Sequence, residues 1–172
     1  MPALPANRPS SLKTVLRYRN PAIVERFRKE LPVSRREAEQ IWRETLKWLW
    51  FCGTSPKGTR RELLTPMSVV DEMWHTFVLF TREYTEFCQR HFGRYVHHAP
   101  GTHAEHHRFI ARLKSDPARV RKQVLQRRRS QYERVVEELG ATTLRRWYID
   151  YAAKYSPETL RTLRVRALKQ AS

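Results

Sequence analysis

The sequence of 172 residues lacks any apolar run approaching the ~18–20 residues that a membrane-spanning helix needs. Its first ten residues are rich in proline and contain no apolar core of the kind found in secretory signals. It has only two cysteines, Cys52 and Cys88, and both fall within apolar helical patterns. Two buried thiols favour a reducing compartment and no disulfide framework. These absences together predict a soluble, cytoplasmic protein.

Glycine is also scarce, and none of the five glycines belongs to a glycine-rich loop that could bind phosphate. No serine or cysteine lies in a pattern typical of a nucleophile activated by histidine and aspartate. No segment alternates apolar and polar residues with a period of two, and there is no internal repeat. The sequence therefore predicts no β-sheet, and it leaves open whether the protein is an enzyme.

Acidic residues are half as frequent as basic ones, with 17 Asp and Glu against 34 Lys and Arg, which gives a net charge of +17. The excess of positive charge is 7 over residues 1–100 and 10 over the shorter stretch 101–172. Such a surplus attracts polyanions, which include nucleic acid, an acidic protein or peptide, and an anionic membrane surface. The alternative is a basic surface that only keeps the protein solvated.

Helical periodicity recurs along the chain, and the aromatic and aliphatic content is high enough for a substantial core. The most prominent element is an amphipathic helix over about 66–92, with Thr65 as its N-cap and Gly93 as its stop signal. We predict a single all-α domain over residues 12–170, with six to seven helices organised around this central helix. A disordered, proline-rich segment is expected at residues 1–11. Within the domain, residues 101–170 form a basic helical part.

All seven histidines lie in the window between residues 65 and 107. Asp71 and His75 are four residues apart, so they share one face of the central helix. If the loop with His97 and His98 folds back, two histidines and a carboxylate converge, as in non-haem iron sites. We therefore predict that Asp71, His75, His97 and His98 form a site for one Zn, Fe or Cu ion, with catalysis left open. Alternatively, Asp71 and His75 are a buried hydrogen-bonded pair that fixes this loop.

The remaining histidines are assigned other positions. His91 lies at the C-terminus of the predicted central helix, where an imidazolium would meet the negative end of the helix dipole. His103, His106 and His107 are expected to be exposed.

A second candidate site is a basic surface on the helix that runs from Pro117 to Leu139. Its members are Arg121, Lys122, Arg127, Arg128, Arg129 and Arg134. The aromatic residues Trp147, Tyr148 and Tyr151 follow nearby and could stack on bases, although their helical spacing favours the core. The alternative function is thus a non-catalytic binding module for nucleic acid or for an acidic protein or peptide.

One stretch of the sequence also resembles a known family. The stretch Asp71-Glu72-Met73-Trp74-His75, with Tyr84, Phe87, Gly93 and the loop His97-His98-Ala99-Pro100, is similar to the glycine-rich domain-containing protein-like family. The resemblance covers roughly residues 12–100 and implies an all-α domain. It directs attention to the histidine-containing window and implies no particular activity. The chain departs from the family in having Phe77 where plant members often have a second histidine, and in lacking a glycine-rich tail.

Overall fold

The computed structural model describes residues 8–171, except 57, 60 and 100, and every regular element in this part of the chain is helical. The elements are α1 (Leu12–Val15), α2 (Pro21–Glu30), α3 (Arg35–Gly53), the 3-10 helix η1 (Thr65–Met67), α4 (Ser68–Leu79), α5 (Thr81–Phe92), α6 (His103–Ser115), α7 (Pro117–Leu139), α8 (Ala141–Arg145), the π-helix η2 (Arg146–Asp150), α9 (Tyr151–Lys154) and α10 (Pro157–Ala171). Seven of these helices have ten residues or more, and the predicted all-α fold is confirmed. None of the described helices is both long and apolar enough to cross a membrane.

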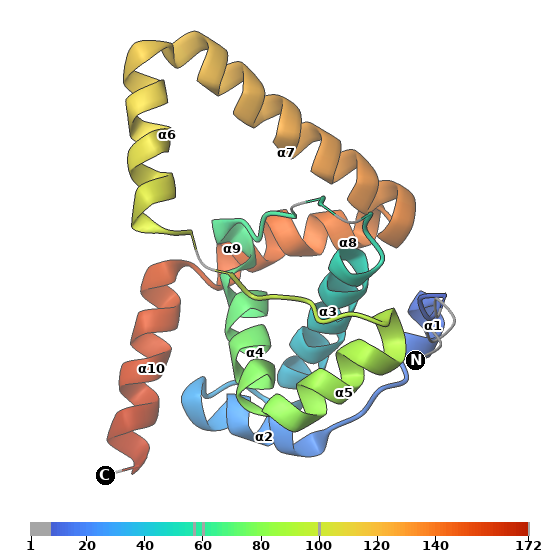
Figure 1. Ribbon diagram of the computed structural model, residues 1–172. Helices are drawn as coiled ribbons and strands as arrows, with labels where there is room; N and C mark the ends of the chain where they lie inside the picture. The colour runs from blue at the N-terminus through green and yellow to red at the C-terminus, as the bar shows by residue number, and fades with distance from the viewer. Residues whose placement is uncertain (1–7, 57, 60, 100, 172) are drawn as a thin grey trace.

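Helix α3 occupies the centre of the body, and α1, α2, α4, α5 and α7 pack against it (Figure 1). It begins where the Ser34 hydroxyl accepts a hydrogen bond from the Glu37 amide at 3.2 Å. Its apolar residues lie on several faces, and Ile41, Leu49 and Phe51 are completely buried. Burying a side chain of this size is worth about 1.5–3 kcal/mol, so α3 contributes strongly to the core, as does the 66–92 segment, whose Met73, Phe77 and Tyr84 are also completely buried.

The predicted single helix over 66–92 is wrong, because the chain bends at Phe80 and forms two helices, α4 and α5. Phe80 leaves the helical region with φ −84° and ψ 65°, and the two helices point in different directions (Figure 1). In a straight helix Phe77 and Phe87 would be about 15 Å apart along the axis. The bend folds α5 back, so that the ring of Phe77 lies 5.3 Å from that of Phe87 and 5.0 Å from that of Tyr84. Aromatic packing across the bend therefore replaces the continuous helix.

The N-terminal segment is attached to the body from Ser10 onward. The Ser10 amide donates to the carbonyl of His91 at 2.8 Å, and the Ser10 carbonyl accepts from the indole of Trp50 at 2.9 Å. Residues 1–7 of the segment predicted to be disordered lie outside the described part of the chain.

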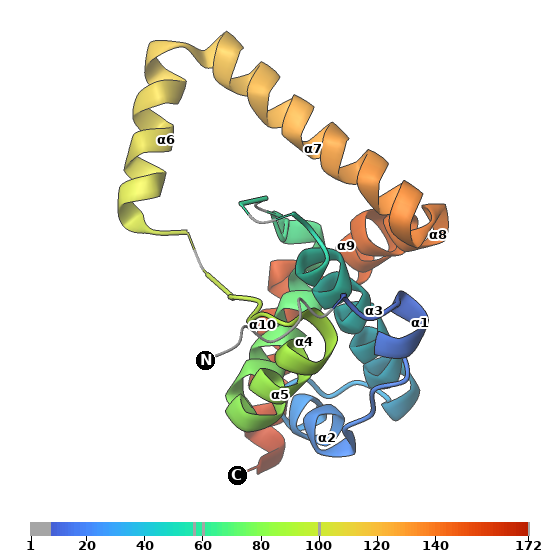
Figure 2. The ribbon, with the colours of Figure 1, turned by 45° about the vertical axis from the view of Figure 1, so that its right-hand side comes forward.

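Helices α6 and α7 form an arm that leaves the body after residue 102 and returns to it near residue 131 (Figures 1 and 2). No residue of α6 is buried, and α7 buries only Val120, Gln131 and Val135. The side-chain amide of Gln131 attaches the returning helix, because it accepts from the Glu62 amide at 2.9 Å and donates to the Glu62 carbonyl at 2.8 Å. We call α6 and α7 together the α6–α7 arm.

The chain after the arm is anchored on a buried carboxylate of α3. Glu44 is fully buried and accepts hydrogen bonds from Lys47 at 3.0 Å, Arg146 at 2.8 Å and the indole of Trp147 at 3.0 Å. Trp147 is itself fully buried and packs edge-on against Trp48, with ring centroids 5.8 Å apart. This tryptophan therefore belongs to the core, as its spacing indicated.

Candidate functional site

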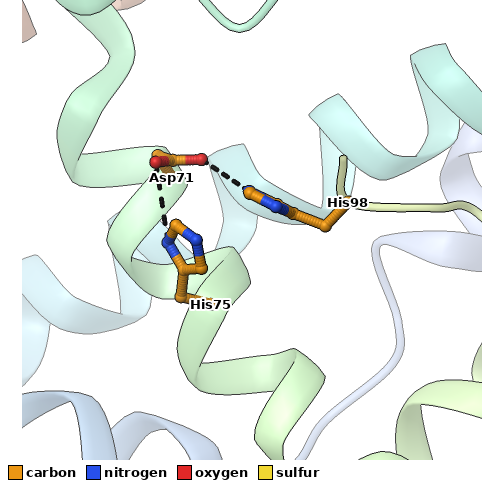
Figure 3. Close-up of side chains that lie close together, drawn as sticks. All are labelled: Asp71, His75 and His98. Carbon is orange, nitrogen blue, oxygen red and sulfur yellow. Dashed lines mark hydrogen bonds and ion pairs between the residues drawn. The ribbon is translucent and has the colours of Figure 1, made fainter. Parts of the chain in front are cut away.

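The side chains of Asp71, His75 and His98 converge beside α4 (Figure 3). Asp71 lies in the first turn of α4, and His75 lies one turn later. His98 comes from the extended segment over residues 94–99 that follows α5, which we call the strap. Nε2 of His98 lies 2.8 Å from Oδ1 of Asp71, and Nδ1 of His75 lies 3.5 Å from Oδ2 of the same carboxylate. One donor atom of each residue lies within 4.8 Å of those of the other two. Asp71 thus contacts both imidazoles, whose ring centroids lie 4.2 Å from each other.

The cluster is accessible from one side. The side chain of His75 is 53% exposed, that of Asp71 30% and that of His98 16%. All three line an open cavity of about 890 Å³ between the strap and the 56–64 loop. A small molecule in this cavity would therefore meet the imidazole and carboxylate groups directly.

Hydrogen bonds from two buried aromatic residues fix the position of the strap. The indole of Trp74 donates to the hydroxyl of Tyr84 at 2.9 Å, and this hydroxyl donates to the carbonyl of Val96 at 2.5 Å. The ring of Trp74 also packs edge-on against His98, with centroids 4.3 Å apart. The residue adjacent to His75 in α4 thus sets the place of the histidine that arrives from the strap.

Arg94 fastens the other end of the strap to the C-terminus of α3. Its guanidinium donates to the carbonyls of Cys52 at 3.0 Å, Gly53 at 3.1 Å and Ser55 at 2.6 Å. A cation suits this position, because carbonyls at a helix C-terminus lack partners within the helix and carry the negative end of its dipole. Sequence reasoning did not single out Arg94, since nothing local marks it among the other arginines.

Three of the four predicted ligands are brought together, and His97 lies outside the cluster. The side chain of His97 is exposed, and its ring faces Tyr95 with centroids 4.9 Å apart. His103 and His107 are exposed on α6, one turn apart, with ring centroids at 5.4 Å. Their exposure agrees with the prediction.

His91 does not have the environment that the sequence suggested. It lies in the last turn of α5, but it is buried against Tyr18 and Phe87, and Nδ1 is 3.2 Å from the hydroxyl of Ser10. Burial, aided by the charge of Arg90, lowers the pKa of His91 below its usual value. The side chain is therefore a neutral core residue, and the expected imidazolium at a helix end is wrong.

This environment predicts a pH dependence of stability. Because the pKa of His91 is lower in the folded than in the unfolded chain, the unfolded state takes up a proton first as the pH falls through about 6.5. The contribution of neutral His91 to stability is complete above this pH and is lost below it. We expect His91→Gln to reduce the fall in melting temperature between about pH 7.5 and 5. The exposed control His107→Gln should leave the fall unchanged, and parallel profiles for wild type and His91→Gln would contradict the assignment.

The predicted basic surface is divided by the structure into three groups. Arg127 and Arg128 line a cavity between α7 and the 59–64 loop. Arg129 pairs with Glu133 at 2.8 Å, and Arg134 pairs with Glu138. Arg121 and Lys122 are exposed near the start of α7 and line none of the described cavities. All six side chains are exposed and are spread around α7, because consecutive helical residues are about 100° apart, and their role as a binding surface stays a prediction.

Comparison with known proteins gives a family. The profile of the UCP032817-like family matches residues 11–115. This match overturns the resemblance to the glycine-rich domain-containing protein-like family, which rested on a short aspartate and tryptophan-histidine pattern with loosely spaced aromatic residues. No curated protein and no solved structure matches the chain. The matched range contains Asp71, His75 and His98 and ends with α6.

Proposed function

The chain belongs to the UCP032817-like family, and we propose that Asp71, His75 and His98 bind one divalent transition-metal ion. The observation that carries the proposal is the convergence of three donor atoms, from a helix and from a distant strap, at the wall of an open cavity. Zn, Fe and Cu are the candidate ions, because imidazole nitrogen suits all three.

The observed spacing suits such an ion. Ligand atoms that each lie about 2.0–2.2 Å from a metal are roughly 3–3.5 Å apart from one another. The two distances from the carboxylate of Asp71, at 2.8 and 3.5 Å, fall near this range. These two distances end on different oxygens, and the donor atoms as a set lie within 4.8 Å, so binding by Nε2 of His98, Nδ1 of His75 and one carboxylate oxygen would draw the side chains closer together.

Three protein ligands beside a cavity are the arrangement of catalytic rather than structural metal sites, because coordination positions stay open for water or substrate. An ion held there supplies Lewis acidity, or a bound water of lowered pKa. The protein groups would then orient the substrate, and the strap fixed by Tyr84 and Arg94 would form one wall of the site. The proposal is thus a metal-dependent site that acts on a small substrate or on part of a larger one.

The same contacts are also those of a purely structural arrangement, in which the hydrogen bond between His98 and Asp71 holds the strap and His75 makes only a longer contact with the carboxylate. The two roles differ in the effect of Asp71→Asn. In a structural role, loss of a charge-assisted hydrogen bond lowers the stability of the metal-free protein by about 1.5–3 kcal/mol. In a metal site, the substitution lowers metal affinity tenfold or more and leaves metal-free stability nearly unchanged.

We expect untagged protein, stripped by chelation and then reconstituted, to retain one Zn, Fe or Cu ion per chain by elemental analysis. Asp71→Asn and His98→Ala should abolish this retention. His97→Ala is the matched control, because it removes the neighbouring imidazole of the same strap and lies outside the cluster. Variants of His103 and His107 exclude binding by the exposed pair on α6. Metal content near zero with all three ions, or equal loss in His97→Ala and His98→Ala, would rule out the site.

A further inference from the structure

The cavity lined by Asp71, His75 and His98 shares lining residues with two others that lie along the α6–α7 arm. One of about 990 Å³ lies against α6 and shares Thr102, Glu105 and Glu62 with the metal cavity. The other, of about 500 Å³, lies between α7 and the 59–64 loop and shares Arg61 and Glu62 with it. We call the three together the inner groove. A ligand longer than one cavity could thus extend from either helix of the arm to the metal cluster.

Basic side chains line this groove at both ends. Arg108 and Arg112 line the cavity against α6, Arg127 and Arg128 line the one against α7, and Arg61 lies between them. Arg127 and Arg128 are exposed and make no ion pair within the described residues. Nothing acidic occurs in the arm between Asp116 and Glu133. The lining of the three cavities holds six arginines, Arg94 among them, against the three carboxylates of Glu62, Asp71 and Glu105. The excess is positive, and the planar forks of guanidinium groups match phosphate oxygens.

The groove also offers groups that suit bases. Phe109 is half-buried and lines the α6 cavity between Arg108 and Arg112 in the sequence. On α7, Gln123 and Gln126 line the opposite cavity. An aromatic ring flanked by cations is the arrangement on which single-stranded nucleic acid stacks without sequence preference.

From this lining we infer that the inner groove binds single-stranded nucleic acid, with phosphates on Arg61, Arg108, Arg112, Arg127 and Arg128. Each cavity has the volume of a pocket for one ligand of a few hundred daltons, which is the scale of a nucleotide. A single strand is the expected ligand, because its bases are free to stack on Phe109, whereas the bases of a duplex are already stacked on one another. An acidic peptide would use the charge of the groove but would leave the aromatic ring of Phe109 without a role.

The test is the affinity of the full chain for a fluorescein-labelled oligothymidine of about 20 nucleotides, measured by fluorescence anisotropy. EDTA is present throughout, so that the result does not depend on metal. Arg127→Glu with Arg128→Glu should weaken binding tenfold or more. Arg121→Glu with Lys122→Glu is the matched control, because it makes the same change of charge in the same helix outside the groove. We expect this control to weaken binding threefold at most.

The salt dependence gives a second readout. Five phosphate contacts predict a slope of about −3.5 for the logarithm of affinity against that of salt concentration, and two fewer contacts reduce it by about 1.4. Circular dichroism checks that the variants fold, and Arg127→Gln with Arg128→Gln should act in the same direction as the glutamate pair. Four outcomes would overturn the inference: no binding at low salt, equal losses in the two glutamate pairs, tighter binding of a duplex of equal length, or equal competition by polyglutamate. Each of them leaves the proposed metal site intact.

Discussion

Glu44→Gln is expected to destabilise the protein by about 3–5 kcal/mol, because it breaks a buried ion pair and leaves the cations without their partner. The carboxylate of Glu44 has no exposure to solvent and binds the side chains of Lys47, Arg146 and Trp147. Gln can accept from one of these groups, but it carries no charge, and its own amide hydrogens need acceptors. For a chain of this length the melting temperature should fall by about 6–20 °C.

The matched control for this prediction lies one turn earlier in the same helix. Glu39 pairs with Arg35 at 3.1 Å, and both side chains are more than half exposed. An exposed pair of this spacing is worth about 0.3–0.5 kcal/mol, so Glu39→Gln should shift the melting temperature by a degree or two. Thermal unfolding of the two variants separates the cases, and equal shifts would mean that the buried network does not anchor the C-terminal helices.

Tyr84→Phe should also have a large effect, since one hydroxyl satisfies two buried groups. Without it the indole N–H of Trp74 and the carbonyl of Val96 lose their partner. An unpaired buried donor or acceptor costs about 1–3 kcal/mol, so we expect a loss of about 2–4 kcal/mol for the pair. The strap would also lose its fixed position beside His98, and metal affinity should fall with stability.

Tyr95→Phe serves as the control for Tyr84→Phe. The ring of Tyr95 packs edge-on against Tyr84 at 5.2 Å, and its hydroxyl makes no hydrogen bond within the described residues. Chemical denaturation should show little change for Tyr95→Phe. If Tyr84→Phe lowers stability but leaves metal affinity at the wild-type value, the strap is held in place by other contacts, and Tyr84 has no role in positioning His98.

The sequence predicts most of the helices but not how they meet. The 66–92 segment keeps its apolar spacing through Phe80, so periodicity gives no sign of the bend there. The ring packing of Phe77 on Phe87 that stabilises the bend is visible only after folding. Ser34 and Glu37 have the spacing of a capping box, and Ser34 does cap α3, but the carboxylate of Glu37 turns to Lys154 and Tyr155 instead of completing the box. The contacts of Glu37 are with residues more than a hundred positions later in the chain, and a local sequence pattern does not reveal them.

The candidate site shows the same limit. Asp71 and His75 could be predicted as neighbours because helical geometry is local. The choice between His97 and His98 could not, because it depends on which way an extended strap presents alternate side chains. Arg94 and Tyr84, which set that orientation, act through carbonyls of other segments. Likewise, the sequence shows Glu44 only as one of several charged residues on an amphipathic helix. Its burial and its hydrogen bond from Trp147 are visible only in the folded structure.

The π-helix of Arg146–Asp150 imposes a constraint on chain length. It lies within a helical run from Ala141 to Lys154, and its hydrogen bonds span one residue more than those of an α-helix. The wider turn allows adjacent residues, Arg146 and Trp147, to reach the same carboxylate. Deleting one residue would restore an α-helix with the residues after it still in register, so the buried rings of Tyr151 and Tyr155 would keep their places. The expected loss falls instead on the contacts of Arg146 and Trp147 with Glu44, which depend on the one extra residue of the wider turn.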